Sequence, residues 1–215
     1  MPKPTFFRLP EEKRMRLVKA AYAEFTRAPF ADASISHIIK DAGIPRGSFY
    51  QYFEDKSDIF FYLLDRMRDS AKGLTQRTLD EQKGDFFATV AILFDKAIDV
   101  LVDGSYAPFY RNVFMYMDFH AVAKLSPTTH HPKDKGQFVE LIVSGIDRSQ
   151  LDVRSDDEVR MLVHLVLGLF MQTMGYYYNH LADGEDTSVL ALKKRMAQLL
   201  QWLKYGATTK EEAHD

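Results

Sequence analysis

The residues best suited to contact with a polyanion lie together in one short run, PRGSFYQYF, at positions 45–53. Arg46 and Gln51 have side chains that suit the edges of guanine and adenine. Other side chains carry hydroxyl groups that can donate hydrogen bonds to phosphate oxygens, namely Ser48, Tyr50 and Tyr52. The run therefore indicates contact with DNA.

Two short helices joined by a tight turn must position this run. The first helix stops at Gly43, a residue that readily takes the left-handed conformation. The second covers about positions 45–53 and turns Phe49 and Phe53 inward. Two helices with such a turn form a helix-turn-helix, whose second helix fits the major groove of DNA. Three-helix bundles that never touch DNA have the same outline, and that alternative stays open at this point.

Helices and basic residues flank the motif. A helix from Pro10 to about Arg27 precedes it, and a long helix follows it. Ser36, near the start of the motif's first helix, and Lys56, near the start of the long helix, are natural phosphate anchors. Residues 1–56 hold ten Lys and Arg against seven Asp and Glu, whereas the remainder has a net charge of −5. This asymmetry suggests that only the front end meets a polyanion.

The composition excludes several classes of protein. The chain has 215 residues, of which 46% are hydrophobic, so it can bury a sizeable core. It has no cysteine, which excludes disulfide frameworks, Cys-based zinc sites and thiol nucleophiles. Its first residues show no secretory signal pattern. We therefore expect a cytoplasmic protein.

Two further features suggest other kinds of site. His130 and His131 lie in a Pro- and Lys-containing connection without a cluster of acidic ligands, so we expect no metal site and no cofactor. The uncharged stretch 161–178 is near the length that spans a bilayer. It contains His, Gln, two Gly and three consecutive Tyr, so we expect a helix buried in the protein or in an oligomer interface, and no membrane partner.

The motif resembles the DNA-binding module of the TetR-type (tetracycline-repressor-like) one-component transcription regulators. The resemblance covers roughly residues 10–65, and the matching residues are Ile38, Ala42-Gly43-Ile44, Arg46-Gly47-Ser48-Phe49-Tyr50, Tyr52-Phe53 and Lys56-Ser57-Asp58-Ile59. Members of that family are dimers with a three-helix DNA reader and a helical body that binds a small ligand. The resemblance implies an all-α fold, in which a helix-turn-helix domain (1–56) is joined by a long helix to a ligand-binding and dimerisation domain (57–205). The small, charged tail 206–215 is expected to be disordered.

Carried over position by position, the resemblance implies a set of DNA contacts. They are Ser36, Pro45, Arg46, Gly47, Ser48, Tyr50, Gln51, Tyr52 and Lys56. The family most often has His where this chain has Tyr52, but a phenol still reaches a phosphate. The Gly-aromatic pair common after the family's first helix reads Pro29-Phe30 here, which leaves the path of that loop open.

The body carries no comparable motif, but its periodicity predicts helices at 85–102, 108–123, 136–148, 156–180 and 187–205. In the last of these, apolar residues step by three and four as in a helix-packing seam, and they are Val189, Leu192, Met196, Leu199 and Leu203. With the uncharged stretch, this seam suggests the two-fold four-helix interface through which the family dimerises. Packing within one chain is the alternative.

The resemblance also supplies a ligand pocket, for which the aromatic, Met and His side chains of the body are the candidates. They are Phe94, Phe109, Tyr110, Phe114, Met117, His120, His164, Phe170, Met171 and Met174. Without the resemblance, an aromatic stripe at helical spacing is ordinary core. These side chains favour a small apolar or amphipathic ligand.

The leading hypothesis is a ligand-responsive transcription regulator. As a homodimer it would bind a palindromic double-stranded DNA operator, most often as a repressor, and a small-molecule effector would release it. The alternative is a helix-turn-helix DNA binder without an effector. A helical enzyme is not expected, because the sequence shows no nucleophile–base pair, glycine-rich phosphate loop or metal cluster, and an enzyme would leave the run at 45–53 unexplained.

Overall fold

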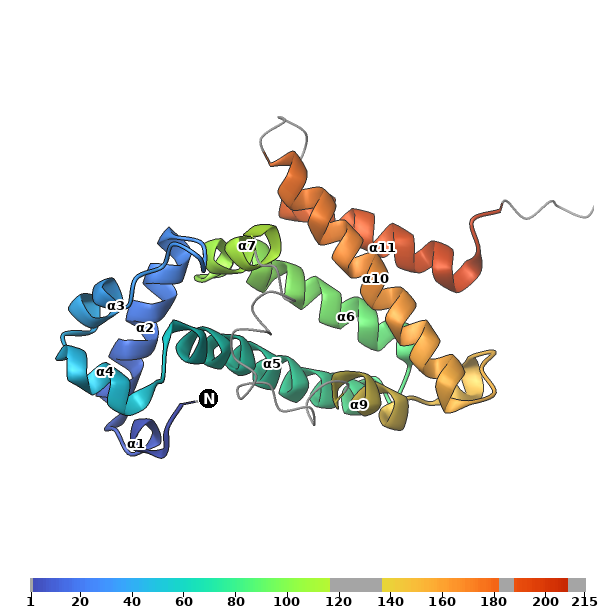
Figure 1. Ribbon diagram of the computed structural model, residues 1–215. Coiled ribbons are helices and arrows are strands. Elements are labelled where there is room, and N and C mark those ends of the chain that lie inside the picture. The colour runs from blue at the N-terminus through green and yellow to red at the C-terminus, as the bar shows by residue number, and fades with distance from the viewer. Residues whose placement is uncertain (1, 117–136, 182–187, 209–215) are drawn as a thin grey trace, which may run out of the picture. The chain divides into compact units, whose positions relative to one another are not determined.

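The computed structural model describes residues 2–116, 137–181 and 188–208, and every regular element in these ranges is a helix (Figure 1). The helices form two compact units. Unit 1 comprises the described residues of Met1–Leu74 and Val100–Phe138, and unit 2 those of Thr75–Asp99 and Val139–Asp215. The all-α fold expected from the sequence is therefore confirmed.

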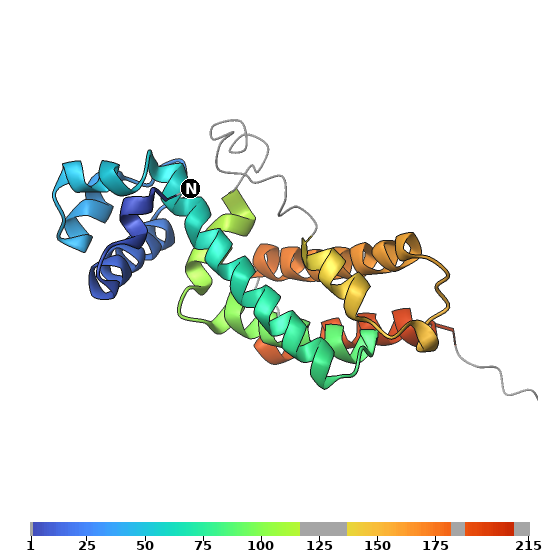
Figure 2. The ribbon, with the colours of Figure 1, turned by 90° about the horizontal axis from the view of Figure 1, so that it is seen from below.

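Unit 1 contains the helix-turn-helix segment. Its helices are α1 (Pro4–Phe7), α2 (Glu11–Arg27), α3 (Ile35–Ala42), α4 (Arg46–Tyr52), most of α5 (Lys56–Glu81) and α7 (Ala107–Tyr116). Figure 2 shows α2, α3 and α4 packed together at the N-terminal end of the chain. Asp55 caps α5, because its Oδ1 accepts hydrogen bonds from the N–H groups of Ser57 at 2.7 Å and Asp58 at 3.1 Å.

Aromatic side chains form the core of unit 1. The ring of Phe60 meets Phe25 edge to face at 4.8 Å between centroids and Phe109 at 5.7 Å. Tyr22 stacks on Tyr106 at 3.9 Å. Since aromatic pairs stabilise beyond their buried area, this cluster ties α7 firmly to α2 and α5.

Unit 2 is built from α6 (Phe86–Ile98), most of α9 (Gln137–Gly145), the 3-10 turn η3 (Arg148–Gln150), α10 (Asp156–His180) and α11 (Val189–Tyr205), together with the end of α5. Phe94 of α6 stacks on Phe170 of α10, with the ring centroids 4.6 Å apart. Lys193 of α11 pairs with Asp95 at 2.9 Å and with Asp99 at 2.7 Å. Helix α11 is thereby joined to α6 by both packing and charge.

The helices of the body lie at the positions that periodicity predicted, but several of them begin or end a few residues away from the predicted bounds. The π-helical turn η1 (Asp99–Asp103) replaces the last α-helical turn expected at 85–102. The helix expected at 108–123 is described as far as Tyr116, and its remainder lies outside the described residues. So do His130, His131 and positions 209–215 of the tail. The short helix α1 was not expected.

Helix α10 is long and apolar enough, by length and composition alone, to cross a membrane. Its best window has a mean hydropathy of 1.2, and 33% of that window is buried in the chain. A core helix of a soluble protein passes the same test, and α10 buries Val163, Phe170 and Met174 within unit 2. The large apolar side chains that α10 leaves exposed are those of Met161, Leu165 and Met171.

Candidate DNA-binding interface and effector-binding residues

The turn between α3 and α4 has the geometry that its sequence predicts. Ser34 caps α3, since its side chain accepts a hydrogen bond from the N–H of Ser36 at 3.2 Å. Gly43 ends the helix with φ 63° and ψ 39°, in the left-handed region where other residues are strained. The N–H of Ile44 then donates to the carbonyl of Ile39 at 3.2 Å, which closes the turn.

Helix α4 has one buried and one open face. Phe49 and, just after the helix, Phe53 are fully buried, as expected for the residues that hold it against the rest of unit 1. Arg46, Tyr50 and Gln51 are exposed on the opposite side. The helix therefore presents a guanidinium, a phenol and an amide outward, which are the groups that contact phosphates and base edges.

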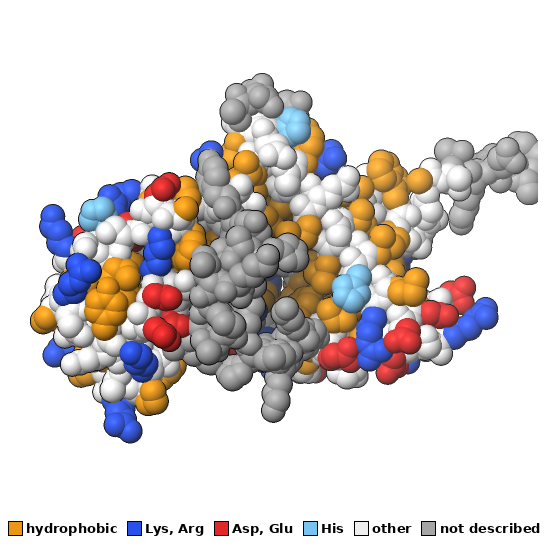
Figure 3. Space-filling model, viewed as in Figure 1, with side chains coloured by type: hydrophobic (Ala, Val, Ile, Leu, Met, Phe, Trp, Pro, Cys, Tyr) orange, Lys and Arg blue, Asp and Glu red, His pale blue; other side chains and the backbone are white. Residues whose placement is uncertain are grey.

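The nine residues expected at DNA differ in their exposure. The exposed ones are Ser36, Pro45, Arg46, Gly47, Tyr50 and Gln51, and the half-buried ones are Ser48, Tyr52 and Lys56. Lys and Arg side chains are also prominent on the visible face of this part of the molecule (Figure 3).

Gly47 has no internal reason to be a glycine. A Cβ at this position would meet no heavy atom within 4 Å, and its backbone is ordinary helix. Glycine weakens a helix relative to alanine by roughly 0.5–1 kcal/mol. An exposed helical glycine beside open space leaves room for another molecule to approach the backbone of α4 closely.

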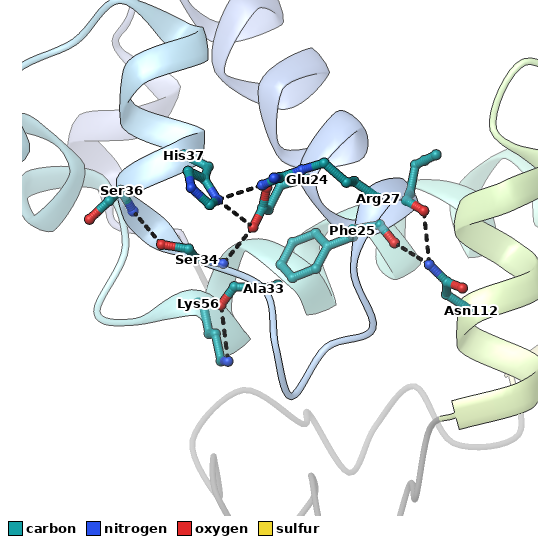
Figure 4. A network of polar contacts seen from close by, with 10 residues as sticks. Glu24, Phe25, Arg27, Ala33, Ser34, Ser36, His37, Lys56 and Asn112 are labelled. Atoms are coloured by element: carbon teal, nitrogen blue, oxygen red, sulfur yellow. Dashed lines mark hydrogen bonds and ion pairs between the residues drawn. The ribbon is translucent and has the colours of Figure 1, made fainter.

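A buried carboxylate joins α2 to α3 (Figure 4). Glu24 is 1% exposed, and its side chain accepts hydrogen bonds from Arg27 and, at 2.6 Å, from the N–H of Ser34. Nδ1 of His37 lies 3.2 Å from the same carboxylate. Burial acts to raise the pKa of Glu24, but the hydrogen bonds from Arg27, Ser34 and His37 outweigh it, so the pKa lies below its ordinary value.

Lys56 is engaged inside unit 1. Its Nζ donates to the carbonyls of Ala31 at 2.7 Å and Ala33 at 3.1 Å, and it lies 5.1 Å from the ring centroid of Phe30. The loop Pro29-Phe30, whose path the sequence left open, is thus held over the start of α5. Lys56 was expected as a phosphate anchor, and the structure gives it a second task that the sequence did not suggest.

Asn112 attaches α7 to the end of α2 (Figure 4). Its side-chain N–H groups donate to the carbonyls of Phe25 at 2.9 Å and Thr26 at 3.0 Å, in the last turn of α2. Such terminal carbonyls have few intrahelical donors, so an amide there stabilises the helix end. Burial raises the pKa values of the nearby Tyr22 and Tyr110. Helix α7 is therefore coupled to the helix-turn-helix by polar as well as aromatic contacts.

The candidate ligand residues divide between the two units. In unit 1, Phe109 and Tyr110 are buried and Phe114 is half-buried. In unit 2 the buried ones are Phe94, Phe170 and Met174, and the exposed ones are His164 and Met171. Met117 and His120 lie outside the described residues. Among the described residues, no group of three or more His, Asp or Glu could hold a metal ion.

The seam expected at the dimer interface is partly internal. Leu192 and Met196 are 4% and 2% exposed and pack within the single chain, which is the alternative left open by the sequence. Val189, Leu199 and Leu203 are half-buried. The large exposed apolar residues of α10 and α11 are instead Met161, Leu165, Met171, Leu190, Trp202 and Tyr205.

The side chain of Asn112 and the segment before α2 make contacts that the sequence did not predict. Asn112 looked like an ordinary polar residue of an aromatic helix, and no pattern marked it. The segment before α2 looked like a loop, although the pair Phe6-Phe7 between two prolines was a signal that it packs. Lys3 and Thr5 of this segment donate hydrogen bonds to carbonyls of α4.

Two protein-family models together match 170 of the 215 residues. The model for the "Tetracyclin repressor-like, C-terminal domain" matches residues 85–207, and that for "Bacterial regulatory proteins, tetR family" matches residues 17–63. An uncharacterized HTH-type transcriptional regulator of Bacillus subtilis (strain 168), YdgC, is 43% identical over 70 residues, which is 33% of this chain and 36% of that protein. An HTH-type transcriptional regulator of Staphylococcus aureus (strain bovine RF122 / ET3-1) is 36% identical over 55 residues, 26% of this chain and 30% of that protein. Each of these two matches spans about a third of the relative's length.

Solved structures resemble the chain over nearly its full length. A TetR family transcriptional regulator from Chloroflexus aurantiacus J-10-fl has a TM-score of 0.51 and 25% identity, covering 96% of this chain and 98% of that one. A TetR-family transcriptional regulator from Pectobacterium atrosepticum has a TM-score of 0.60 and 18% identity, covering 93% and 96%. At 18% identity, the similarity to the Pectobacterium atrosepticum structure shows a shared fold and nothing more.

Proposed function

Because the chain belongs to the TetR family of transcription regulators, which are not enzymes, we propose that it binds a palindromic operator as a homodimer and leaves it when a small effector binds. The observation that carries the proposal is the divided surface of α4. The buried side chain of Phe49 packs the helix against unit 1, while the exposed side chains of Arg46, Tyr50 and Gln51 are available for contact with a major groove. DNA reading then belongs to residues 1–56, and dimerisation and effector binding to 57–205.

The exposed apolar face of unit 2 supports a dimer. Met161, Leu165 and Gly168 follow one another at helical spacing on α10, and a Cβ on Gly168 would meet nothing within 4 Å. Leu190 and Trp202 add exposed apolar area on α11. Exposed apolar patches of this kind favour association, and we place the two-fold interface on this face, with Val189, Leu199 and Leu203 at its border.

The effector response is supported by the attachment of α7 to α2. The candidate ligand residues Phe109, Tyr110 and Phe114 lie on the same helix as Asn112, whose amide holds the end of α2. An effector that shifts α7 would therefore shift α2 and the motif packed on it, and so favour a pose that fits successive major grooves less well. The aromatic side chains of these residues suit an apolar or amphipathic effector. Taken by themselves, so do the unit 2 candidates Phe94, Phe170 and Met174. Because we propose that the protein acts on DNA, we also propose that it works in the cytoplasm.

The test begins with selection of the operator. Purified protein selects bound fragments from a random double-stranded pool, and a gel-shift then measures affinity at physiological salt against random competitor. The proposal predicts an enriched inverted repeat, one dimer per site, and a band that a small apolar compound dissolves. No enriched sequence would refute the regulator. If no compound in a library of apolar and amphipathic molecules abolishes the shifted band, the result would favour the alternative, a helix-turn-helix DNA binder without an effector.

A further inference from the structure

The segment before α2 closes the C-terminal end of the reading helix. The N–H of Lys3 donates to the carbonyl of Tyr52 at 2.8 Å, and its Nζ donates to the carbonyl of Tyr50 at 2.8 Å. The hydroxyl of Thr5 donates to the carbonyl of Gln51. The last four carbonyls of any helix lack intrahelical donors. In α4, three consecutive carbonyls near the C-terminal end therefore accept hydrogen bonds from Lys3 and Thr5. Each donor lies 46 to 49 positions before its acceptor in the sequence.

A buried phenylalanine fixes the segment in this place. Phe6 is fully buried, and its ring lies 4.9 Å from Phe53 and 5.0 Å from Tyr62 between centroids. A third ring, that of Tyr52, lies 6.5 Å away. The segment is thus wedged between the end of α4 and the start of α5. Its position is set by tertiary packing and not by its own short helix.

The reading helix depends on such support. Helix α4 has only seven residues, and isolated helices shorter than about 12–15 residues are marginal in water. Phe49 fastens its inner side, and Gly43 fixes its beginning. The last turn holds Tyr50 and Gln51, whose side chains face outward while their carbonyls accept the bonds from Lys3 and Thr5.

We propose that residues 2–9 form an N-terminal clamp that positions the last turn of α4, and with it Tyr50, Gln51 and Tyr52, for reading DNA. The inference rests on the proposed function and deepens it. Lys3 and Thr5 act as positioning residues through α4 and not as phosphate contacts. The clamp consequently contributes to discrimination between operator and random DNA more than to general affinity for polyanions.

The decisive variants are Thr5→Val and Thr5→Ser. Thr5→Val keeps the shape and neutral charge of the side chain but removes the hydroxyl, whereas Thr5→Ser removes only a methyl group and keeps the hydroxyl that donates to the carbonyl of Gln51. Losing one such bond corresponds to about a fivefold change in an equilibrium constant. We expect Thr5→Val to bind the selected operator about fivefold more weakly and random DNA unchanged, with Thr5→Ser restoring operator affinity. These variants are preferred to truncation of Phe6, because removing a fully buried ring would destabilise unit 1 as a whole.

Hydrogen exchange on the free protein and salt dependence separate positioning from direct contact. Without DNA, amides of α4 should exchange faster in Thr5→Val than in wild type or Thr5→Ser. Lys3→Met should do the same and should leave the slope of log affinity against log salt unchanged, whereas a lost phosphate contact reduces that slope by about 0.9. Lys13→Met is the matched control, because Lys13 is equally exposed but lies on α2, and it should not alter exchange in α4.

Wild-type operator affinity and wild-type α4 exchange in Thr5→Val would overturn the clamp while leaving the proposed function intact. A reduced salt slope in Lys3→Met, with equal loss on operator and random DNA, would overturn it in favour of a phosphate contact. If the wild-type protein enriches no sequence at all, the proposed function is refuted, and the clamp proposal, which rests on it, is refuted as well.

Discussion

Replacing Gly47 by alanine should move stability and DNA affinity in opposite directions. In the free protein the new methyl group enters open space, since nothing lies within 4 Å of it. Alanine is the better helix former by roughly 0.5–1 kcal/mol. For a chain of this size, a gain of 1 kcal/mol raises Tm by about 2–4 °C. Gly47→Ala should therefore melt roughly 1–4 °C above wild type.

We expect the same methyl group to obstruct the close approach of DNA to the backbone of α4. Adding a methyl group to a tightly packed contact costs about 1–3 kcal/mol. The Kd for the operator should accordingly rise roughly 5- to 150-fold. The two effects are measured by thermal unfolding of the free protein and by gel-shift titration of the selected operator.

Lys83→Gly provides the control. Lys83 is exposed in unit 2 and adopts a left-handed backbone with φ 52°, which glycine tolerates better. This variant should change Tm without changing operator affinity. If Gly47→Ala melts higher but binds the operator like wild type, the backbone of α4 does not approach DNA closely at Gly47, and the explanation given for this glycine is refuted.

Three further predictions concern the interface, the network and the dimer. Arg46→Ala should lose about 1–3 kcal/mol at the operator and relax base preference at one position, as read by selection from a randomised site; equal losses on operator and random DNA would exclude base reading. Glu24→Gln should lower the free energy of unfolding at pH 7 by about 1.5–3 kcal/mol. Because the pKa of Glu24 is lowered by folding, its stabilisation is complete above its ordinary value of 4.5 and is lost as pH falls through the lowered pKa; denaturant titrations of wild type and variant should converge in acid, and a constant difference would contradict this. Leu165→Glu should yield a folded monomer by light scattering that binds the palindrome weakly, whereas the partly exposed control Leu169→Met should stay dimeric.

Much of the helix-turn-helix could be predicted because its constraints are local. Gly43 was predicted to end α3 because glycine readily takes the left-handed conformation, and Phe49 was predicted to face inward; the structure confirms both. The exposed face of α4 followed from the same pattern. Local periodicity also placed α10 at positions 156–180, where the structure has it.

Contacts between distant segments could not be predicted. A lysine such as Lys56 gives no sign that backbone carbonyls of a preceding loop will surround its ammonium group. Periodicity showed that Leu192 and Met196 face a neighbouring helix, but it could not say whether that helix belongs to the same chain. The role of Asn112 likewise depends on carbonyls 86 and 87 positions away.

The long separation in sequence between the clamp and α4 has a kinetic consequence. Lys3 precedes Tyr50 by 47 positions and is therefore synthesised well before it. The N-terminal clamp cannot bind α4 until the helices between them have been made. Docking over such a separation requires closure of a long loop and follows the more local pairing of α2 with α3. Bonds formed late in folding act chiefly on the unfolding rate. Thr5→Val should thus leave the refolding rate near that of wild type and make unit 1 unfold faster.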